Sequence, residues 1–146
     1  MKEKMIVGWR ETLSLPGLGI EQINAKVDTG ARTSCLHAFK VESFIKEETL
    51  WVRFWIHPVQ RNNDKVTVCE AKVIDERIVR DSGGHEESRY VIQSDVCLGG
   101  QTWPIEITLT NRENMGFRML LGRTAMHRRI LVNPTKSFLI AFEESK

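Results

Sequence analysis

The residues most able to do chemistry in this chain are Asp28-Thr29-Gly30, which follow the apolar end of an expected strand. Two carboxylates that share one proton can hydrolyse a peptide bond, because one acts as base on a water while the other polarises the carbonyl. A threonine hydroxyl can hold such a pair by hydrogen bonding. A glycine lets the backbone donate to the carboxylate without a Cβ in the way. Asp28, Thr29 and Gly30 are therefore the candidate catalytic residues, although Asp-x-Gly also occurs in ordinary turns.

Metal chemistry has little support from the residue spacing. The sequence has no His-Glu-x-x-His, and His85-Glu86-Glu87 lacks a second histidine one helical turn later. Cys35-x-His37 offers two ligands without a third nearby in the sequence. We therefore expect no metal and no cofactor, and we interpret the histidines as surface or core residues.

Length and composition describe an ordinary globular chain. The 146 residues predict a single domain over 1–146, and a formal net charge of +2 is too small to indicate nucleic-acid binding. No apolar run approaches the roughly 20 residues of a membrane span, and the N-terminus lacks the apolar segment of a signal peptide. Three cysteines without motif spacing fit reduced thiols. We expect a cytoplasmic protein with no membrane contact and no direct nucleic-acid contact.

The elements that must position the candidate residues are mainly strands. Alternating apolar residues predict strands over 50–56 and 88–98, and Gly99-Gly100 predicts a tight turn into a third strand over 102–110. Other strands are expected over 66–75, 76–80 and, after Pro134, 137–142. Only 122–129 is typical of a short helix. The chain is predicted to be mainly β with one helix near its end.

Three ordered blocks resemble a known family. They are GWRETLSLPGLG (8–19), KVDTGARTSCLHA (26–38, with Cys35 where the family has alanine) and MLLGRTAM (119–126). The chain resembles the retropepsin-like aspartic peptidases of bacteria grouped with the RimB proteins, often labelled "ATP-dependent zinc protease". We interpret "zinc" and "ATP-dependent" as inherited names. The resemblance covers nearly the whole chain and implies a closed acid-protease barrel in which Asp28 is catalytic.

The same resemblance implies a strand beside the catalytic loop, formed by Leu120-Leu121-Gly122. Arg123 follows it and is interpreted as a structural ion-pair or dimer-contact arginine, with substrate contact as the alternative. Ala31 and Arg32 continue the catalytic loop and are candidate substrate-binding residues, with Arg32 divided evenly between substrate contact and structural contact. The family's later acidic residue is replaced here by Asn133, to which we assign no chemistry.

Retropepsins also have a flap, a mobile Gly-rich hairpin that covers the cleft. Segment 81–87 has the expected place in the chain order, and 57–65 is the other candidate. Asp81-Ser82-Gly83 is a variant of the catalytic motif. It follows Arg80 rather than an apolar strand end, and it comes too soon after Asp28 to hold a second lobe. We therefore predict that the flap tip, rather than a second catalytic loop, contains Ser82, Gly83, Gly84 and His85.

One Asp-Thr-Gly supplies one carboxylate, so the second is expected from Asp28 of a second copy in a twofold homodimer. The predicted function is an aspartic endopeptidase that acts on a peptide or protein. The family's association with ATP-grasp glutamate ligases implies that this substrate carries an acidic, glutamate-rich tail. Two alternatives stay open: a catalytically silent barrel that binds peptides or acts as an adaptor, and a zinc metallopeptidase.

Overall fold

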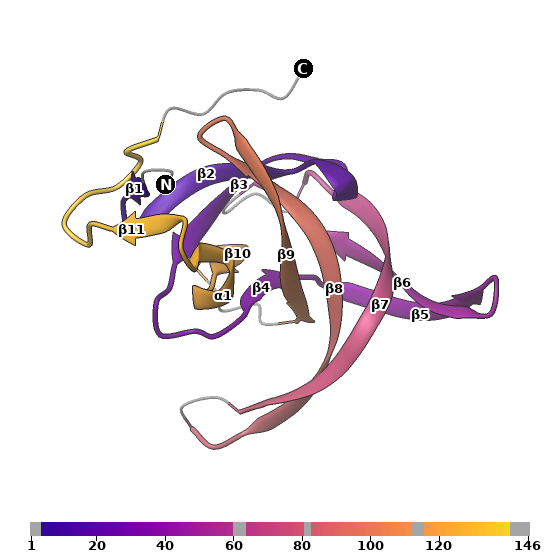
Figure 1. Ribbon diagram of the computed structural model, residues 1–146. Coiled ribbons are helices and arrows are strands. Elements are labelled where there is room, and N and C mark those ends of the chain that lie inside the picture. Colours follow the sequence, from indigo (N-terminus) through magenta and orange to yellow (C-terminus); the bar gives the residue numbers. More distant parts are fainter. Residues whose placement is uncertain (1–3, 60–63, 81–82, 112–115, 141–146) are drawn as a thin grey trace.

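The computed structural model describes residues 4–59, 64–80, 83–111 and 116–140, which form a mainly β protein with one short α-helix (Figure 1). The strands are β1 (Met5–Val7), β2 (Arg10–Leu15), β3 (Ile20–Val27), β4 (Ser34–His37), β5 (Lys40–Lys46), β6 (Thr49–Ile56), β7 (Thr67–Arg80), β8 (Glu86–Leu98), β9 (Gln101–Thr110), β10 (Met119–Leu121) and β11 (Ile130–Val132). A 3-10 turn, η1 (Pro16–Leu18), follows β2, and the helix α1 (Arg123–Met126) follows β10. No helix in these ranges is long and apolar enough to cross a membrane.

Nine strands form one sheet in the order β2-β3-β10-β4-β9-β8-β7-β6-β5. β3 pairs in parallel with β10, and β4 pairs in parallel with β9. The hairpins β5–β6, β6–β7, β7–β8 and β8–β9 are antiparallel. β10, which comes from far along the chain, therefore lies between the strand that leads into the Asp28 loop and the strand that leaves it.

The sheet curls until its first strand, β2, meets β8, and full closure into a barrel stays a prediction. β2 reaches β8 but shares only the pair Ser14 and Cys97 with it. β8 is already paired with β7 from Glu86 to Ile92, so only its last residues are left for β2. β7, β6 and β5 continue outward from β8 and end at the free edge of β5. The β5–β6 hairpin consequently projects from the body of the molecule (Figure 1).

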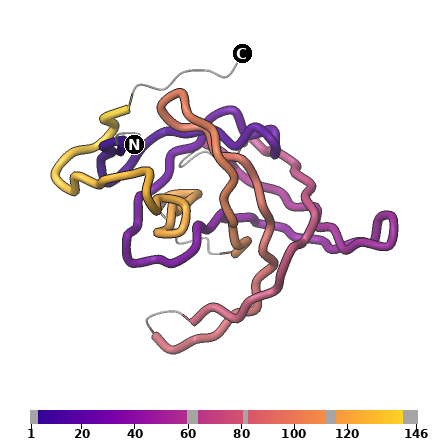
Figure 2. Tube along the Cα trace, in the orientation of Figure 1, coloured from indigo at the N-terminus to yellow at the C-terminus, as the bar shows by residue number. Residues whose placement is uncertain are grey.

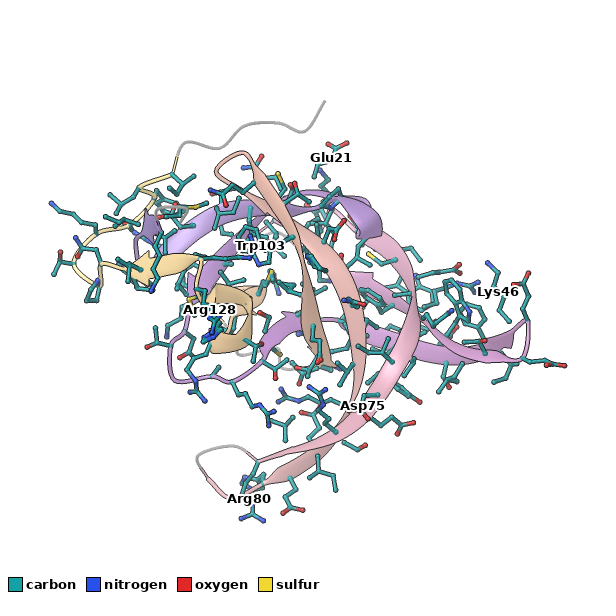
Figure 3. All side chains as sticks on the ribbon, viewed as in Figure 1. Glu21, Lys46, Asp75, Arg80, Trp103 and Arg128 are labelled. Carbon is teal, nitrogen blue, oxygen red and sulfur yellow. The ribbon has the colours of Figure 1, made fainter. Side chains whose placement is uncertain are left out.

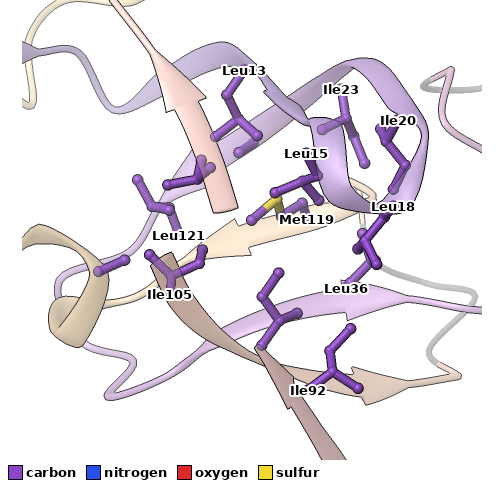
Figure 4. Packing of buried hydrophobic residues seen from close by; sticks show 14 of the residues in the cluster. Leu13, Leu15, Leu18, Ile20, Ile23, Leu36, Ile92, Ile105, Met119 and Leu121 are labelled. Atoms are coloured by element: carbon purple, nitrogen blue, oxygen red, sulfur yellow. The ribbon is translucent and has the colours of Figure 1, made fainter. Parts of the chain in front are cut away.

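The core lies inside the curl of the sheet. Val52, Phe54 and Ile56 of β6 are fully buried, as the alternation in the sequence predicts. Figure 4 shows core side chains from several strands and from η1 converging: Leu13, Leu15, Leu18, Ile20, Ile23, Leu36, Ile92, Ile105, Met119 and Leu121. Met119 and Leu121 belong to β10, so burial anchors the strand that lies beside the Asp28 loop.

The longest hairpin joins β7 and β8. Their pairing extends to Arg80 and Glu86, and a bulge between Val73 and Asp75 bends β7 where the sequence predicted two separate strands. At the other end of β8, Gly99-Gly100 forms the predicted tight turn into β9, with both residues at positive φ. The far end of the β7–β8 hairpin projects from the body, away from the β5–β6 hairpin (Figure 1).

The strand predicted over 137–142 is wrong for its described residues, 137–140, and the remainder lies outside the described residues. These residues bind a buried carboxylate instead. Glu11 on β2 accepts hydrogen bonds from the backbone amides of Gly8, Leu139 and Ile140 at 2.7, 2.8 and 3.1 Å. A side chain thus satisfies N–H groups that a strand ladder would otherwise pair. The parallel pairing of β1 with β11 was also not predicted from the sequence.

Candidate functional site

The Asp28 loop, residues 28–33, begins where β3 lies beside β10. Leu121 of β10 is paired with Val27, the residue before Asp28. The backbone N–H of Asp28 donates to the carbonyl of Leu121 at 2.9 Å. The structure therefore brings together two segments, 28–30 and 120–122, that the sequence placed side by side. The catalytic role of the first segment stays a prediction.

The first turn after β10 is tied to the same loop. The N–H of Arg123 donates to the carbonyl of Ala31 at 2.8 Å, and the N–H of Thr124 donates to the carbonyl of Arg32 at 3.0 Å. These bonds use backbone groups, so they do not depend on which side chains the loop carries. We call residues 26–33 together with 122–129 the loop–helix unit.

Gly122 occupies a place where no larger residue fits. A Cβ at this position would lie 2.6 Å from the carbonyl carbon of Thr33 and 2.8 Å from the nitrogen of Ser34. The N–H of Gly122 donates to Oγ of Ser34 at 3.0 Å. Backbone contact between the end of β10 and the start of β4 therefore explains why glycine follows two apolar residues here.

The Asp28 side chain is half-buried at the start of its loop. Its Oδ1 accepts a hydrogen bond from the N–H of Gly30 at 2.9 Å. A Cβ at Gly30 would lie 3.2 Å from that oxygen, so glycine keeps the approach open. Thr29 is exposed. The hydrogen bond across a dimer that the sequence predicted for Thr29 stays a prediction.

Arg123 also holds the loop through its side chain. Its Nη1 donates to the carbonyl oxygens of Thr29 and Gly30 at 3.1 and 3.2 Å. The guanidinium remains exposed and permanently charged. A positive charge therefore lies directly beside the loop that carries Asp28.

The sequence analysis missed Arg89, a buried arginine on β8. Its side chain is 9% exposed, its Nε donates to Glu87 at 2.9 Å, and its Nη1 lies 3.6 Å from the sulfur of Cys35. Thr110 also donates to Glu87, at 3.0 Å. Arg89 thus connects the β7–β8 hairpin to β4, the strand that the Asp28 loop enters. An arginine in a strand pattern is normally assigned to the solvent face, so the sequence carried no signal for this contact.

The predicted flap tip lies only partly within the described residues. Gly83, Gly84 and His85 are described, whereas Asp81 and Ser82 lie outside the described residues. Gly84 has a φ of +84°, a backbone conformation that glycine adopts readily. The β7–β8 hairpin ends at this tip, but closure of the tip over Asp28 stays a prediction. The rival flap segment before β7 also contains residues outside the described ones.

The loop–helix unit has a large excess of positive charge. Its one acid is Asp28, and its five cations are Lys26, Arg32, Arg123, Arg128 and Arg129. Its formal charge is +5 − 1 = +4, whereas the whole chain carries +2, so the rest of the chain carries −2. Figure 3 shows Arg128 beside α1, while Lys46 and Arg80 lie near the far ends of the two projecting hairpins. These two segments therefore carry a local excess of positive charge.

The titratable groups with shifted pKa values lie away from the loop–helix unit. A hydrogen bond from Arg77, then one from the backbone of Glu76, holds the pKa of Asp75 below its ordinary value. The pKa of Arg77 is raised, first by its hydrogen bond to Glu106 and then by the one to Asp75. Burial raises the pKa of the Cys69 thiol to about 12, so this thiol stays protonated at neutral pH. These groups fix the β7–β8 hairpin and its base.

The two residues considered as metal ligands, Cys35 and His37, are both buried on β4. Their spacing of two places them on one side of the strand. Among the described residues, no group of three or more His, Cys, Asp or Glu side chains gathers as it would around a metal ion.

Known proteins match this chain over nearly its full length. The model of the RimB-like family, described as retropepsin-like aspartic endopeptidase RimB, matches residues 6–143. Proteins named probable alpha-L-glutamate ligase from Shewanella pealeana and Parasynechococcus marenigrum are 47% and 50% identical over 137 residues, or 94% of this chain. The chain spans only 30% and 29% of their lengths. A Legionella pneumophila protein of unknown function shares the fold, with a TM-score of 0.79 and 24% identity over 95% of this chain and 100% of that one.

These names contradict the function predicted from the sequence. An aspartic endopeptidase working through paired Asp28 residues was expected, whereas curated relatives at 45% to 50% identity are named as probable ligases. The sequence blocks identified the loop, the strand beside it and the family. They did not identify the reaction, because a fold keeps its local geometry while the chemistry it serves changes.

Proposed function

Because the chain belongs to the RimB-like family of retropepsin-like aspartic endopeptidases and its curated relatives are named as ligases, we propose that it is the glutamate-chain-binding module of an α-L-glutamate ligase system. The module holds an acidic peptide against the loop–helix unit while the ligase lengthens that peptide. The ligand class is a peptide or protein segment with successive glutamate carboxylates. The place of action is the cytoplasm, because ATP is available there for ligation and cysteines stay reduced there.

The observation that carries this proposal is the charge of the loop–helix unit. Five cations against one acid lie on two segments that backbone hydrogen bonds tie together. Fixed cations attract a chain of carboxylates without being rearranged when it arrives. The exposed arginines Arg32 and Arg128 are free to pair with carboxylates in a forked geometry.

Asp28 is the single negative charge within this unit, so it opposes the binding of an acidic chain. Replacing it with asparagine keeps its shape and removes that repulsion. The Asp28→Asn variant also distinguishes hydrolysis, which the family's name describes, from a role in ligation, which the relatives' names describe. Release of glutamate by the wild type that is lost in the variant would assign hydrolysis to the chain. Binding that is equal or about twofold tighter in the variant, without such release, agrees with the module proposed here.

A titration of dye-labelled α-linked hexaglutamate, followed by fluorescence anisotropy, tests the proposal. The double variant Arg32→Glu/Arg128→Glu is expected to bind about tenfold more weakly, because two attractive charges become repulsive. The matched control is Lys46→Glu/Lys72→Glu, which makes the same charge change at exposed sites outside the unit. Equal losses in both double variants would show only a response to net charge and would overturn the proposal.

A second copy of the chain is a separate proposed partner. The predicted twofold homodimer would bring two loop–helix units together and would double the local charge. Sedimentation velocity over a range of concentrations, with and without hexaglutamate, measures this assembly. A monomer under all of these conditions would remove the dimer and leave the binding proposal intact.

A further inference from the structure

The two-stranded sheet β1–β11 carries an exposed apolar face. Ile6 and Leu131 are paired in register, so their side chains lie next to each other on the same face. They are 56% and 52% exposed, whereas their neighbours Val7 and Ile130 are buried against the core. Paired apolar side chains left in water on a short sheet are typical of a surface that a partner covers.

The segment after β11 brings two more exposed apolar residues next to this small sheet. Residues 136–138 run beside the link from β1 to β2, with Phe138 and Leu139 also exposed and the Arg10 guanidinium over one side of the Phe138 ring. Close packing fixes this segment, because a Cβ on Gly8 would lie 2.4 Å from the carbonyl oxygen of Lys136. The buried carboxylate of Glu11 holds its last amides. We call Ile6, Leu131, Phe138 and Leu139 the terminal face.

Both ends of the described chain lie at the terminal face. A Cβ on Gly99 would lie 3.1 Å from the side chain of Met5 and 3.2 Å from that of Ile140. Met5 and Ile140, near the two ends of the described chain, therefore meet at the same turn, between β8 and β9. Figure 2 shows the indigo start and the yellow end of the trace on one side of the molecule.

The relatives indicate what covers this face. In the Shewanella and Parasynechococcus proteins the segment like this chain makes up less than a third of a protein named as a ligase. The additional length joins that segment at one or both of its ends, and both ends of the described chain lie beside the terminal face. We propose that the terminal face is the docking surface for the α-L-glutamate ligase module, joined to this domain in those relatives and supplied by a separate chain otherwise. This proposal rests on the proposed function for its partner.

The terminal face differs from the other exposed apolar residues in its position beside the chain ends. Ile45 and Ile78 are also strongly exposed, at 69% and 70%, but each lies on a different projecting hairpin, and no chain end lies near either in the pairing of the sheet. A module joined at a chain end is held at a high effective concentration, about millimolar for a short linker. A modest apolar contact at the terminal face is then enough for docking.

Hydrogen exchange in a fused protein tests the proposal. This chain replaces the matched segment of the Shewanella pealeana ligase, and exchange is compared with that of the chain alone at equal concentration. The amides of 4–8 and 128–133 are expected to exchange at least about tenfold more slowly in the fusion. Ile6→Asp/Leu131→Asp should remove that protection, whereas the matched control Ile45→Asp/Ile78→Asp should leave it. Unchanged exchange of the β8 and β9 amides shows that each variant is folded.

Two results would overturn the proposal. Equal exchange at 4–8 and 128–133 in the fusion and in the chain alone would show modules that are tethered but not docked. Protection that appears in the chain alone as its concentration rises, to the same extent as in the fusion, would assign the terminal face to a second copy. Neither result depends on hexaglutamate, so docking and the proposed binding function fail independently.

Discussion

The Asp28 loop and the β7–β8 hairpin are held by different kinds of contact. Backbone hydrogen bonds fix the loop, and Gly122 leaves no space beneath it. Side chains hold the hairpin. Arg77 donates to Glu106 on β9, and Arg89 donates to Glu87 and contacts Cys35 on β4. Backbone bonds survive most substitutions, whereas a side-chain tie is lost with one residue. The comparison predicts a rigid loop that presents fixed charges and a hairpin that can move.

The largest expected effect comes from Gly122→Ala. The new Cβ would lie 2.6 to 2.8 Å from backbone atoms of β4 and its approach, and backbone cannot turn aside as a flexible side chain can. The free energy of unfolding should fall by about 3 kcal/mol. Urea denaturation measures the loss.

Gly116→Ala is the matched control for that substitution. A Cβ at Gly116 has no atom within 4 Å, and its φ is not in the left-handed region. Its free energy of unfolding should stay within about 0.5 kcal/mol of the wild type. Equal losses in the two variants would show that the loop is not held by close backbone packing.

Arg89→Met should have an intermediate effect. The substitution removes the bonds to Glu87 and Cys35 while it keeps much of the buried side-chain volume. We expect a loss of about 2 kcal/mol and faster exchange of amides in the β7–β8 hairpin, with the amides of Asp28 and Arg123 unchanged. Arg80→Met, at an exposed ion pair with Glu86, serves as control and should change stability by less than about 0.5 kcal/mol. Faster exchange in the loop as well would show that the two regions move together.

The smallest effect concerns pH and the base of β7. Burial raises the pKa of Cys69 from 9.0 to about 12, so its stabilising contribution is complete below about pH 9 and is lost as pH rises towards 12. When the pH is raised from neutral to 10, the free energy of unfolding should fall by about 1 kcal/mol more in the wild type than in Cys69→Ala. The half-buried Cys97 supplies the control variant Cys97→Ala, which should follow the wild type. Parallel curves for wild type and Cys69→Ala would show that the base of β7 admits water at alkaline pH.

Much of the fold could be predicted from local patterns. The alternation in β6 identified the buried face with Val52 and Phe54, and Gly99-Gly100 identified a turn that requires positive φ. The extent of sheet closure could not be predicted, because it depends on how much of β8 is left unpaired for β2. The pairing of β1 with β11 was also missed, since each is only three residues long and pairs with a strand far along the chain.

The candidate site was predicted in part. The segments 28–30 and 120–122 were expected side by side, and they are. Glu11 and Arg89 were missed, because a charged residue in an alternating strand is ordinarily assigned to solvent. In each case a distant segment supplies part of the contacts: residues 139–140 for Glu11, and Cys35 for Arg89. The reaction itself was predicted wrongly, since a loop motif fixes geometry but not chemistry.

The central claim is that the loop–helix unit binds an acidic chain, and the most direct test is to map the binding site. Two-dimensional amide NMR during a titration with unlabelled hexaglutamate reports this residue by residue. Chemical-shift changes are expected at Gly30, Arg32, Arg123 and Arg128 of the loop–helix unit, to saturate together, and to be absent from β5 and β6. Changes centred on β5 and β6, where Lys40 lies over Trp55 and Lys46 lies over Trp51, or no saturable change in the loop–helix unit, would contradict it.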